Sequence, residues 1–340
     1  MTATTVAAAS PRRFAIDRRI APFLFVAALG FVVYLAIGPQ QFANALTIGA
    51  IYALVALGYT MVYGIIELIN FAHGEIFMVG AFVSMFTLTR VLGQTGAATD
   101  IGSLVFLLVV TFAVTMLILG VIGVLIERFA YRRLRNAPRL APLITAIGIS
   151  FILQNIIQIM FGPSPVNTPQ LIPFSNRLEL FGASIPWVDV FIFLVAVGLM
   201  IGLQQFVNRT KLGRAMRSTA QDREAAQLMG VDINRTIAAT FFLAAALAGA
   251  AGVVQGLHFG NIKFDLGFQA GLKAFTAAVL GGIGNITGAA LGGFVIGFLE
   301  VTAAAFGYAQ WGQAIVFTVL IVVLVFRPAG LLGQQLGERA

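Results

Sequence analysis

Two carboxylates, an imidazole and an amide lie inside a stretch of the sequence that is otherwise mostly apolar. The stretch GIIELINFAHGEIFMVGAF, residues 64–82, contains Glu67, Asn70, His73 and Glu75, and the flanking segments Phe42–Tyr63 and Ile76–Leu88 carry no charge. An ionisable side chain at membrane depth costs about 2.5–3.5 kcal/mol on insertion scales and usually serves a function. Groups of these types could line a water-filled path or relay protons.

Two arrangements of Gly64–Gly74 are compatible with the sequence. In a helix, Glu67, Asn70 and Gly74 would share one face, with His73 near it. The segment is then either a re-entrant break that lines an aqueous path or a tight turn in cytoplasmic water. We assign six residues to the translocation path or gate: Glu67, Asn70, His73, Gly74, Glu75 and Asn285.

The sequence lacks the residues that metal binding, enzyme catalysis or ATP binding would require. Cysteine is absent, and the two histidines, His73 and His258, are predicted on opposite sides of the membrane, so we expect no metal site. Neither G-x-S-x-G nor G-x-x-x-x-G-K-[ST] occurs, so we expect no enzyme activity and no cofactor bound by this chain. The energy for transport must then come from a partner or an ion gradient. A proton-coupled secondary transporter that uses Glu67, His73 and Glu75 is therefore one alternative, and an intramembrane enzyme is a more distant one.

The composition places these residues in a bilayer. Of 340 residues, 59% are hydrophobic and 10% are charged, whereas soluble domains carry about 25% charged residues. We therefore expect an all-α polytopic membrane protein with about 8–10 spans. Apolar runs predict spans near 20–37, 42–63, 75–92, 103–126, 141–161, 187–207, 236–258, 287–306 and 311–326, and the short Gly-rich segment 268–283 is a tenth, broken span.

The positive charges predict an orientation. Lys and Arg concentrate in cytoplasmic loops, so the net charge of +8 reports topology and does not indicate nucleic-acid binding. With the N-terminus inside, all but four of the 21 Lys and Arg fall on the cytoplasmic side. We expect cytoplasmic tails at 1–19 and 328–340 around one membrane domain, 20–327. The four residues outside are Arg90, Arg177, Lys263 and Lys273.

Two interrupted segments suggest an internal repeat. The Gly64–Gly74 stretch interrupts the second and third spans, and a Gly-rich segment around Asn285 interrupts the last third of the chain. Broken helices at matching places in two halves are typical of transport pathways, so we predict two pseudo-symmetric inverted halves. The alternative is that Gly292, Gly293 and Gly297 only permit close helix packing. The predicted outer loop 162–186 contains five prolines. It is either a simple connector or a platform for a soluble partner.

The longest predicted inner loop, 208–235, contains a short polar helix. Ser218 with Gln221, or Thr219 with Asp222, would form a capping box, and Gly230 would close the helix. We therefore predict one helix over Ser218–Met229. Its small apolar residues and mixed charges suit a groove on another protein better than a lipid surface.

These residues resemble a known family. Glu224-Ala225-Ala226 followed by Gly230 resembles the E-A-A-x-x-x-G core of permease subunits of ATP-binding-cassette (ABC) importers, and YALVALGYTMVYGIIELINFAHGEIFMVGAF resembles the first conserved block of branched-chain amino acid permeases of the LivH type. GRAMRSTAQDREAAQLMGVDINR and AFTAAVLGGIGNITGAALGGFVIG resemble the same family, and the resemblance covers about residues 42–330.

The resemblance implies a type II ABC importer-like permease in a bacterial inner membrane. The distribution of Lys and Arg predicts that both termini lie in the cytoplasm. It implies four kinds of partner: a second permease (a homologue or a second copy), two ATPase subunits that bind ATP and Mg, a periplasmic binding protein and the lipid bilayer. It implies Leu, Ile and Val as substrates, and related permeases carry urea or amides. It assigns coupling to the ATPase to Arg214, Arg217, Ser218, Asp222, Arg223, Glu224, Ala225, Ala226 and Gly230.

Overall fold

The computed structural model describes residues 21–68, 70–135, 137–138, 140–180, 182–327 and 329–332. The predicted N-terminal tail lies outside these residues, as does the C-terminal tail apart from 329–332. The described part contains eight helical segments long and apolar enough to cross a membrane, which confirms an all-α polytopic protein. The long helices are α1 Ala21–Ile66, α2 His73–Phe86, α3 Ile101–Ile126, α5 Leu140–Phe161, α6 Trp187–Arg209, α9 Ile233–Phe259, α11 Ile286–Ala305 and α12 Gly312–Phe326.

Shorter elements connect or extend these helices. Two π-helical turns, Thr87–Val91 and Glu127–Tyr131, continue α2 and α3, and the 3-10 turn Ala309–Trp311 precedes α12. The remaining elements are α4 Arg132–Leu134, α7 Lys211–Gln221, α8 Arg223–Leu228, α10 Leu266–Gly281, β1 Val166–Asn167, β2 Arg177–Leu180, β3 Ala183–Pro186 and β4 Asn261–Ile262.

The first two predicted spans are two parts of α1. The helix is interrupted at Gly38, which has φ 80° and ψ 168°, and Pro39 follows. Proline cannot donate the hydrogen bond that a continuous helix needs here, so the chain bends at this point. The predicted tenth span corresponds to α10, whose 16 residues are fewer than the 17 or so that a bilayer requires.

The bundle has a buried interior and an apolar periphery. Helices α2, α9 and α11 are mostly buried, whereas α5, α6 and α12 expose most of their surface. Exposed large side chains such as Phe151, Leu194 and Val325 cover the periphery. Lipid tails are as apolar as these residues, so no aqueous surface is needed there.

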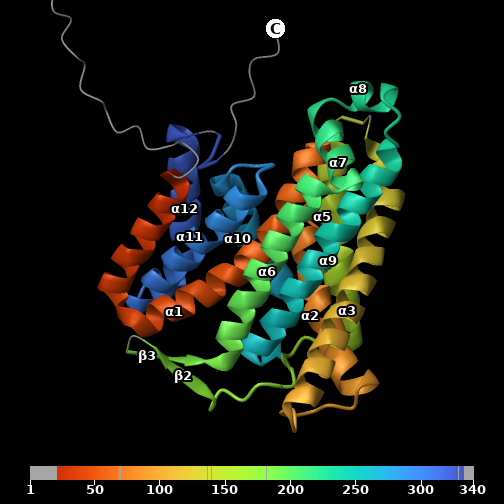
Figure 1. Ribbon diagram of the computed structural model, residues 1–340. Coiled ribbons are helices and arrows are strands. Elements are labelled where there is room, and N and C mark those ends of the chain that lie inside the picture. Colours follow the sequence, from red (N-terminus) through yellow and green to blue (C-terminus); the bar gives the residue numbers. More distant parts are fainter. Residues whose placement is uncertain are drawn as a thin grey trace, which may run out of the picture.

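The two ends of the bundle differ (Figure 1). Helices α7 and α8 lie at one end, here called the α7–α8 end, and the β2–β3 hairpin lies at the opposite end, here called the hairpin end. The Pro-rich loop 162–186 therefore contains local order: β2 pairs with β3, and β1 pairs with β4, which follows α9. Both pairs are antiparallel and short.

Backbone-to-backbone contact joins α1 to α11. A Cβ added to Gly293 would lie 2.4 Å from the amide nitrogen of Ala53, and one added to Gly297 would lie 2.5 Å from the Cα of Gly49. Small residues allow this close approach, and van der Waals packing drives helix association in lipid. The sequence left open whether these glycines permit packing or mark a repeat. The contacts assign them a packing role.

We predict that Gly293→Ala destabilises the protein. The new methyl group meets the α1 backbone, which cannot rotate away, and such overpacking typically costs about 1–3 kcal/mol. The thermal unfolding midpoint of the purified protein should fall. Gly198→Ala on α6 is the matched control, because a Cβ there meets nothing within 4 Å. An equal shift in both variants would contradict the packing role.

Candidate functional site

The α1–α2 connection is a non-helical break that starts at Glu67. This residue has φ 56°, a left-handed conformation, and its amide still donates to the Tyr63 carbonyl at 2.8 Å. Its side chain is exposed. The expected common helical face of Glu67, Asn70 and Gly74 is therefore wrong, because the helix has ended before Asn70.

The buried residue Asn70 accepts hydrogen bonds from the backbone of the break. Its side chain is 2% exposed. Its Oδ1 accepts hydrogen bonds from the Ala72 amide at 3.1 Å and from the Tyr131 hydroxyl at 3.1 Å. Its carbonyl accepts from the His73 amide at 3.1 Å. One asparagine thus satisfies backbone groups freed by the break and ties them to the π-helical turn at the end of α3.

Helix α2 begins beside α1, well before the level at which α1 ends. The His73 ring lies 4.7 Å from that of Tyr59, and a Cβ on Gly58 would meet His73 Nε2. Gly58 precedes Ile66, the last residue of α1, by eight positions, which is about 12 Å of helix rise. The chain therefore turns back into the bundle between 67 and 72, the geometry of a re-entrant break.

Glu75 is the most enclosed acidic group of this region. It is 1% exposed. Its Oε1 accepts from the Ser150 hydroxyl of α5 at 3.3 Å, and its Oε2, which has no hydrogen-bond partner among the residues described, faces Gly267 of α10. In this part of the chain no hydrogen bond or ion pair joins Glu67, His73 and Glu75 to one another. The side chains that a proton relay would use are thus not connected in this conformation.

The second break, Gly282–Asn285, lies against α1 near the first one. Asn285 Oδ1 accepts from the Gly288 amide at 3.0 Å and so caps α11, and its Nδ2 donates to the Leu332 carbonyl at 3.1 Å. The Gly284 amide donates to Thr60 Oγ1 at 3.0 Å. Both interrupted segments therefore meet the last two turns of α1.

The predicted single helix Ser218–Met229 is wrong. Two helices, α7 and α8, meet at Asp222, whose Oδ1 accepts from the amides of Glu224 and Ala225 at 2.9 and 3.0 Å. Helix α7 starts earlier than predicted, at the Thr210 cap. The aspartate satisfies the free amides of a new helix start, and this local cap outweighs the helix-forming run around it.

The predicted end of this loop agrees with the structure. Gly230 has φ 84°, its amide donates to the Gln227 carbonyl, and the Val231 amide donates to the Ala226 carbonyl, each at 3.0 Å. This pair of bonds is a Schellman motif, in which the left-handed residue is most readily glycine. Asp232 then caps α9, because its Oδ1 accepts from the Arg235 amide at 3.0 Å.

The predicted coupling residues divide between the loop surface and its base. Arg214, Ser218, Glu224 and Ala225 are exposed, whereas Ala226 is buried. Arg217 donates to the Val207 carbonyl at 2.9 Å, and Arg223 donates to the Ile65 carbonyl at 3.1 Å, a direct bond between α8 and the end of α1. Leu228 and Met229, not singled out from the sequence, are 89% and 85% exposed. The sequence feature that could have indicated this exposed apolar surface is the pair of large apolar residues directly before Gly230.

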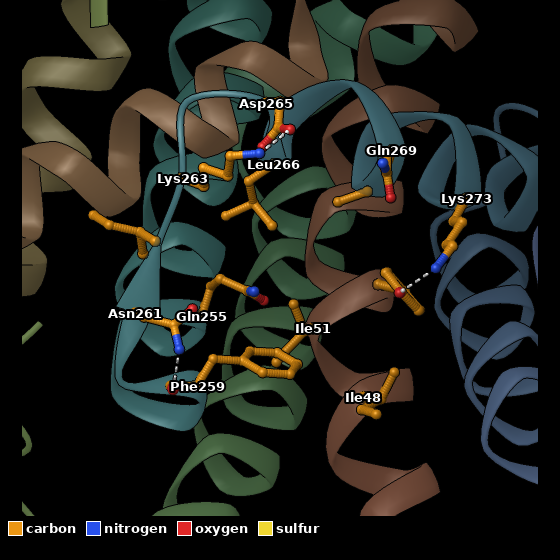
Figure 2. A pocket seen from close by; sticks show the side chains of 13 residues that line it. Ile48, Ile51, Gln255, Phe259, Asn261, Lys263, Asp265, Leu266, Gln269 and Lys273 are labelled. Carbon is orange, nitrogen blue, oxygen red and sulfur yellow. Dashed lines mark hydrogen bonds and ion pairs between the residues drawn. The ribbon is translucent and has the colours of Figure 1, made fainter. Parts of the chain in front are cut away.

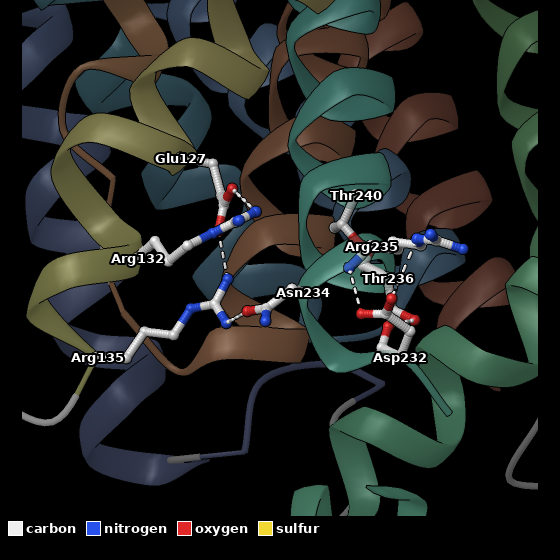
Figure 3. Close-up of polar contacts among 8 residues, drawn as sticks. All are labelled: Glu127, Arg132, Arg135, Asp232, Asn234, Arg235, Thr236 and Thr240. Atoms are coloured by element: carbon white, nitrogen blue, oxygen red, sulfur yellow. Dashed lines mark hydrogen bonds and ion pairs between the residues drawn. The ribbon is translucent and has the colours of Figure 1, made fainter. Parts of the chain in front are cut away.

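A buried ion-pair cluster between α3 and α9 was also missed (Figure 3). Glu127 is fully buried and pairs with Arg132 at 2.9 Å and with Arg135. Arg135 also donates to Asn234 Oδ1 at 2.8 Å, at the start of α9. The sequence feature that could have indicated this cluster is Glu127, the single acidic residue in the Arg-rich segment 127–139. The cluster fixes the end of the 208–235 loop to the turn that carries Tyr131.

A second missed cluster lies inside the bundle. Lys273, expected in an outer connection, belongs to α10, and its Nζ lies 2.7 Å from Glu300 Oε1 of α11. The Tyr52 hydroxyl of α1 donates to Glu300 Oε2 at 2.8 Å. The lysine is therefore not an external charge, and the cluster joins three helices. Because both charges lie far from each other in sequence, no local pattern indicates their pairing.

Comparison with known proteins agrees with this architecture. Residues 41–324 match the family described as "Branched-chain amino acid transport system / permease component". The chain is 43% identical to the high-affinity branched-chain amino acid transport system permease protein BraD of Pseudomonas aeruginosa over 88% of this chain and 97% of that protein. The figures are the same for the corresponding permease protein LivH of Escherichia coli.

More distant relatives include the ribose import permease protein RbsC of Escherichia coli, 26% identical over 55% of this chain and 60% of that protein. No solved structure matches the chain. The family match spans both helix breaks and the coupling loop. The chain belongs to the family of permease components of branched-chain amino acid transport systems.

Proposed function

We propose that this chain forms the translocation path of an ABC importer for the branched-chain amino acids Leu, Ile and Val. The observation that carries the proposal is the 43% identity to BraD and LivH over 97% of their length. The sequence contains no P-loop motif, so ATP-driven transport by this chain requires an ATPase partner.

The proposed complex contains two permease subunits, two ATPase subunits that bind ATP and Mg, and a periplasmic binding protein that delivers the substrate. The second permease is a homologue or a second copy of this chain. The chain would lie in a bacterial inner membrane, with the α7–α8 end in the cytoplasm. The distribution of Lys and Arg supports this orientation.

The experiment is reconstitution. The chain is purified with the products of its neighbouring genes, inserted into liposomes and supplied with ATP inside. Leucine uptake that requires ATP and the binding protein, and that survives an uncoupler, is the expected result. Uptake driven by a proton gradient without ATP would favour the secondary transporter instead. Uptake of urea or an amide in place of leucine would change the substrate assignment.

The exposed tip of the coupling loop fits an ATPase groove. Leu228 and Met229 project from α8, which is held to α1 by Arg223. Apolar side chains at the centre of an interface, surrounded by polar ones, are typical of binding hot spots. Exposed Glu224 and Ser218 supply polar neighbours.

We predict that Leu228→Asp combined with Met229→Asp prevents ATPase binding. Placing charge in an apolar groove should reduce co-purification of the ATPase at least about tenfold. Ile101→Asp is the control, because Ile101 is 80% exposed at the start of α3, at the hairpin end. Normal ATPase recovery with the double variant would count against this surface. Glu224→Lys should uncouple ATP hydrolysis from uptake while the permease stays in the membrane.

We predict that Ser175 lies outside the cell and Ser218 inside. Both residues are exposed, and the chain contains no cysteine. A single introduced cysteine is therefore the only thiol in the chain that the reagent can label. In intact cells an impermeant maleimide should label the Ser175→Cys variant and spare Ser218→Cys. After permeabilisation both should react. The reverse pattern in intact cells would overturn the orientation.

We predict that Asn70→Ala reduces both transport and stability. The substitution leaves the buried Ala72 amide without its side-chain acceptor, and an unsatisfied buried group costs about 1–3 kcal/mol. Tyr131→Phe should cost less, because it leaves the bond from the Ala72 amide to Asn70 in place. Leucine uptake and thermal unfolding measure these effects.

Asn155→Ala is the control for this series, since that asparagine is exposed and bonds only to its own helix. Glu67→Gln tests the charge of the exposed carboxylate separately. If Glu67→Gln and Asn70→Ala both transport normally, the 67–72 break is a structural turn and has no gating role.

A further inference from the structure

A cavity of about 300 Å³ lies between α1, α9 and α10, next to the β1–β4 ribbon (Figure 2). This volume is at the lower end of ligand pockets, so the cavity suits a small molecule. One part of its lining is apolar and includes Ile48, Ile51 and Phe259. Another part is polar, with Lys273 and Gln269 on α10 and Gln255 on α9. Asn261 and the Lys263–Asp265 ion pair, in which Nζ and Oδ2 lie 2.8 Å apart, complete the polar lining.

The polar lining is organised around Lys273. Its side chain is 12% exposed, and Glu300 and Tyr52 hold the ammonium group at 2.7 and 3.3 Å. Glu300 is not part of the lining and lies behind Lys273. An ion pair inside a membrane domain is costly and indicates a functional site by default. Here the arrangement keeps a cation at the cavity wall.

Two amides accompany this cation. Gln269 lies one helical turn before Lys273, and residues at this spacing share a face. Gln255 is 8% exposed, and it lines the same cavity from α9. Figure 2 shows both amides beside the cavity. Each amide supplies an oxygen that can accept a hydrogen bond and a nitrogen that can donate one to a small molecule in the cavity.

We propose that this cavity binds the transported amino acid, with its carboxylate on Lys273. The carboxylate shares the lysine with Glu300, the amide oxygens of Gln255 and Gln269 accept from the ammonium group, and the apolar side chain packs against Ile48, Ile51 and Phe259. This assignment rests on the proposed function, which supplies the substrate class. The competing explanation is that Lys273 and Glu300 only join α10 to α11.

Equilibrium binding separates these explanations. The assembled transporter, without its binding protein, is placed in lipid nanodiscs and titrated with tritiated leucine. The competitors are leucinamide, which lacks the carboxylate, and isocaproate, which lacks the ammonium group. A charge-assisted hydrogen bond to Lys273 should make leucine bind at least about tenfold more tightly than leucinamide.

The variant Lys273→Gln should weaken leucine binding about tenfold and change leucinamide binding less than about twofold. A purely structural ion pair predicts equal losses for both ligands, and that result would overturn the proposal. Unchanged leucine affinity in Lys273→Gln would overturn it too, as would no saturable binding of leucine to the unmodified transporter. Arg90→Gln is the control, because it removes an exposed positive charge outside the cavity.

A second variant keeps the proposal testable if Lys273→Gln does not assemble. Gln255→Ala retains the ion pair, and it should weaken binding of leucine more than that of isocaproate, since only leucine carries the ammonium group. Equal effects on both ligands would overturn the assignment of the amide.

ATP-driven leucine uptake by the unmodified transporter is measured in parallel. Failure of that uptake rejects the proposed function. Normal uptake together with unselective effects of the variants rejects only the binding site.

Discussion

Every buried peptide group that a helix break frees must find a partner inside the protein, and the two breaks of this chain depend on that constraint. Away from water, an unsatisfied amide or carbonyl costs several kcal/mol. Asn70 satisfies groups of the 67–72 break, and Asn285 and Thr60 satisfy groups of the 282–285 break. Both breaks then lie against the same part of α1, which makes α1 the common support of the polar region.

The same constraint connects the breaks to the coupling loop. The Tyr131 hydroxyl that reaches Asn70 belongs to a π-helical turn, and Glu127 in that turn holds Arg135 against the start of α9. π-helical turns often occur at functional sites. Arg223 reaches the last turn of α1 directly. Arg223 therefore links α8 to α1, and Arg135 links the π-helical turn to the start of α9.

Much of this architecture could be predicted from local sequence patterns. Apolar runs located the spans, and Gly230 was expected to close its helix because glycine adopts the left-handed conformation readily. The break between α7 and α8 had a sequence signal, because Asp222 is a favoured helix N-cap residue. The helix-forming residues around it nevertheless suggested one continuous helix. The pairings of Asn70 with Tyr131 and of Lys273 with Glu300 join distant residues, so only the folded chain reveals them.

The glycine contacts between α1 and α11 have a mechanical consequence. Where two backbones touch without intervening side chains, no rotamer can change to absorb a displacement, so the second part of α1 and α11 behave as one rigid body. The bend at Gly38 separates this body from the first part of α1, which is largely exposed. The torsions at Gly38 therefore change the direction of the helix, and the first part still contacts α11 where Gly30 lies against the Phe298 ring. A change in pathway shape beside the rigid pair of helices then requires motion of the helices around it.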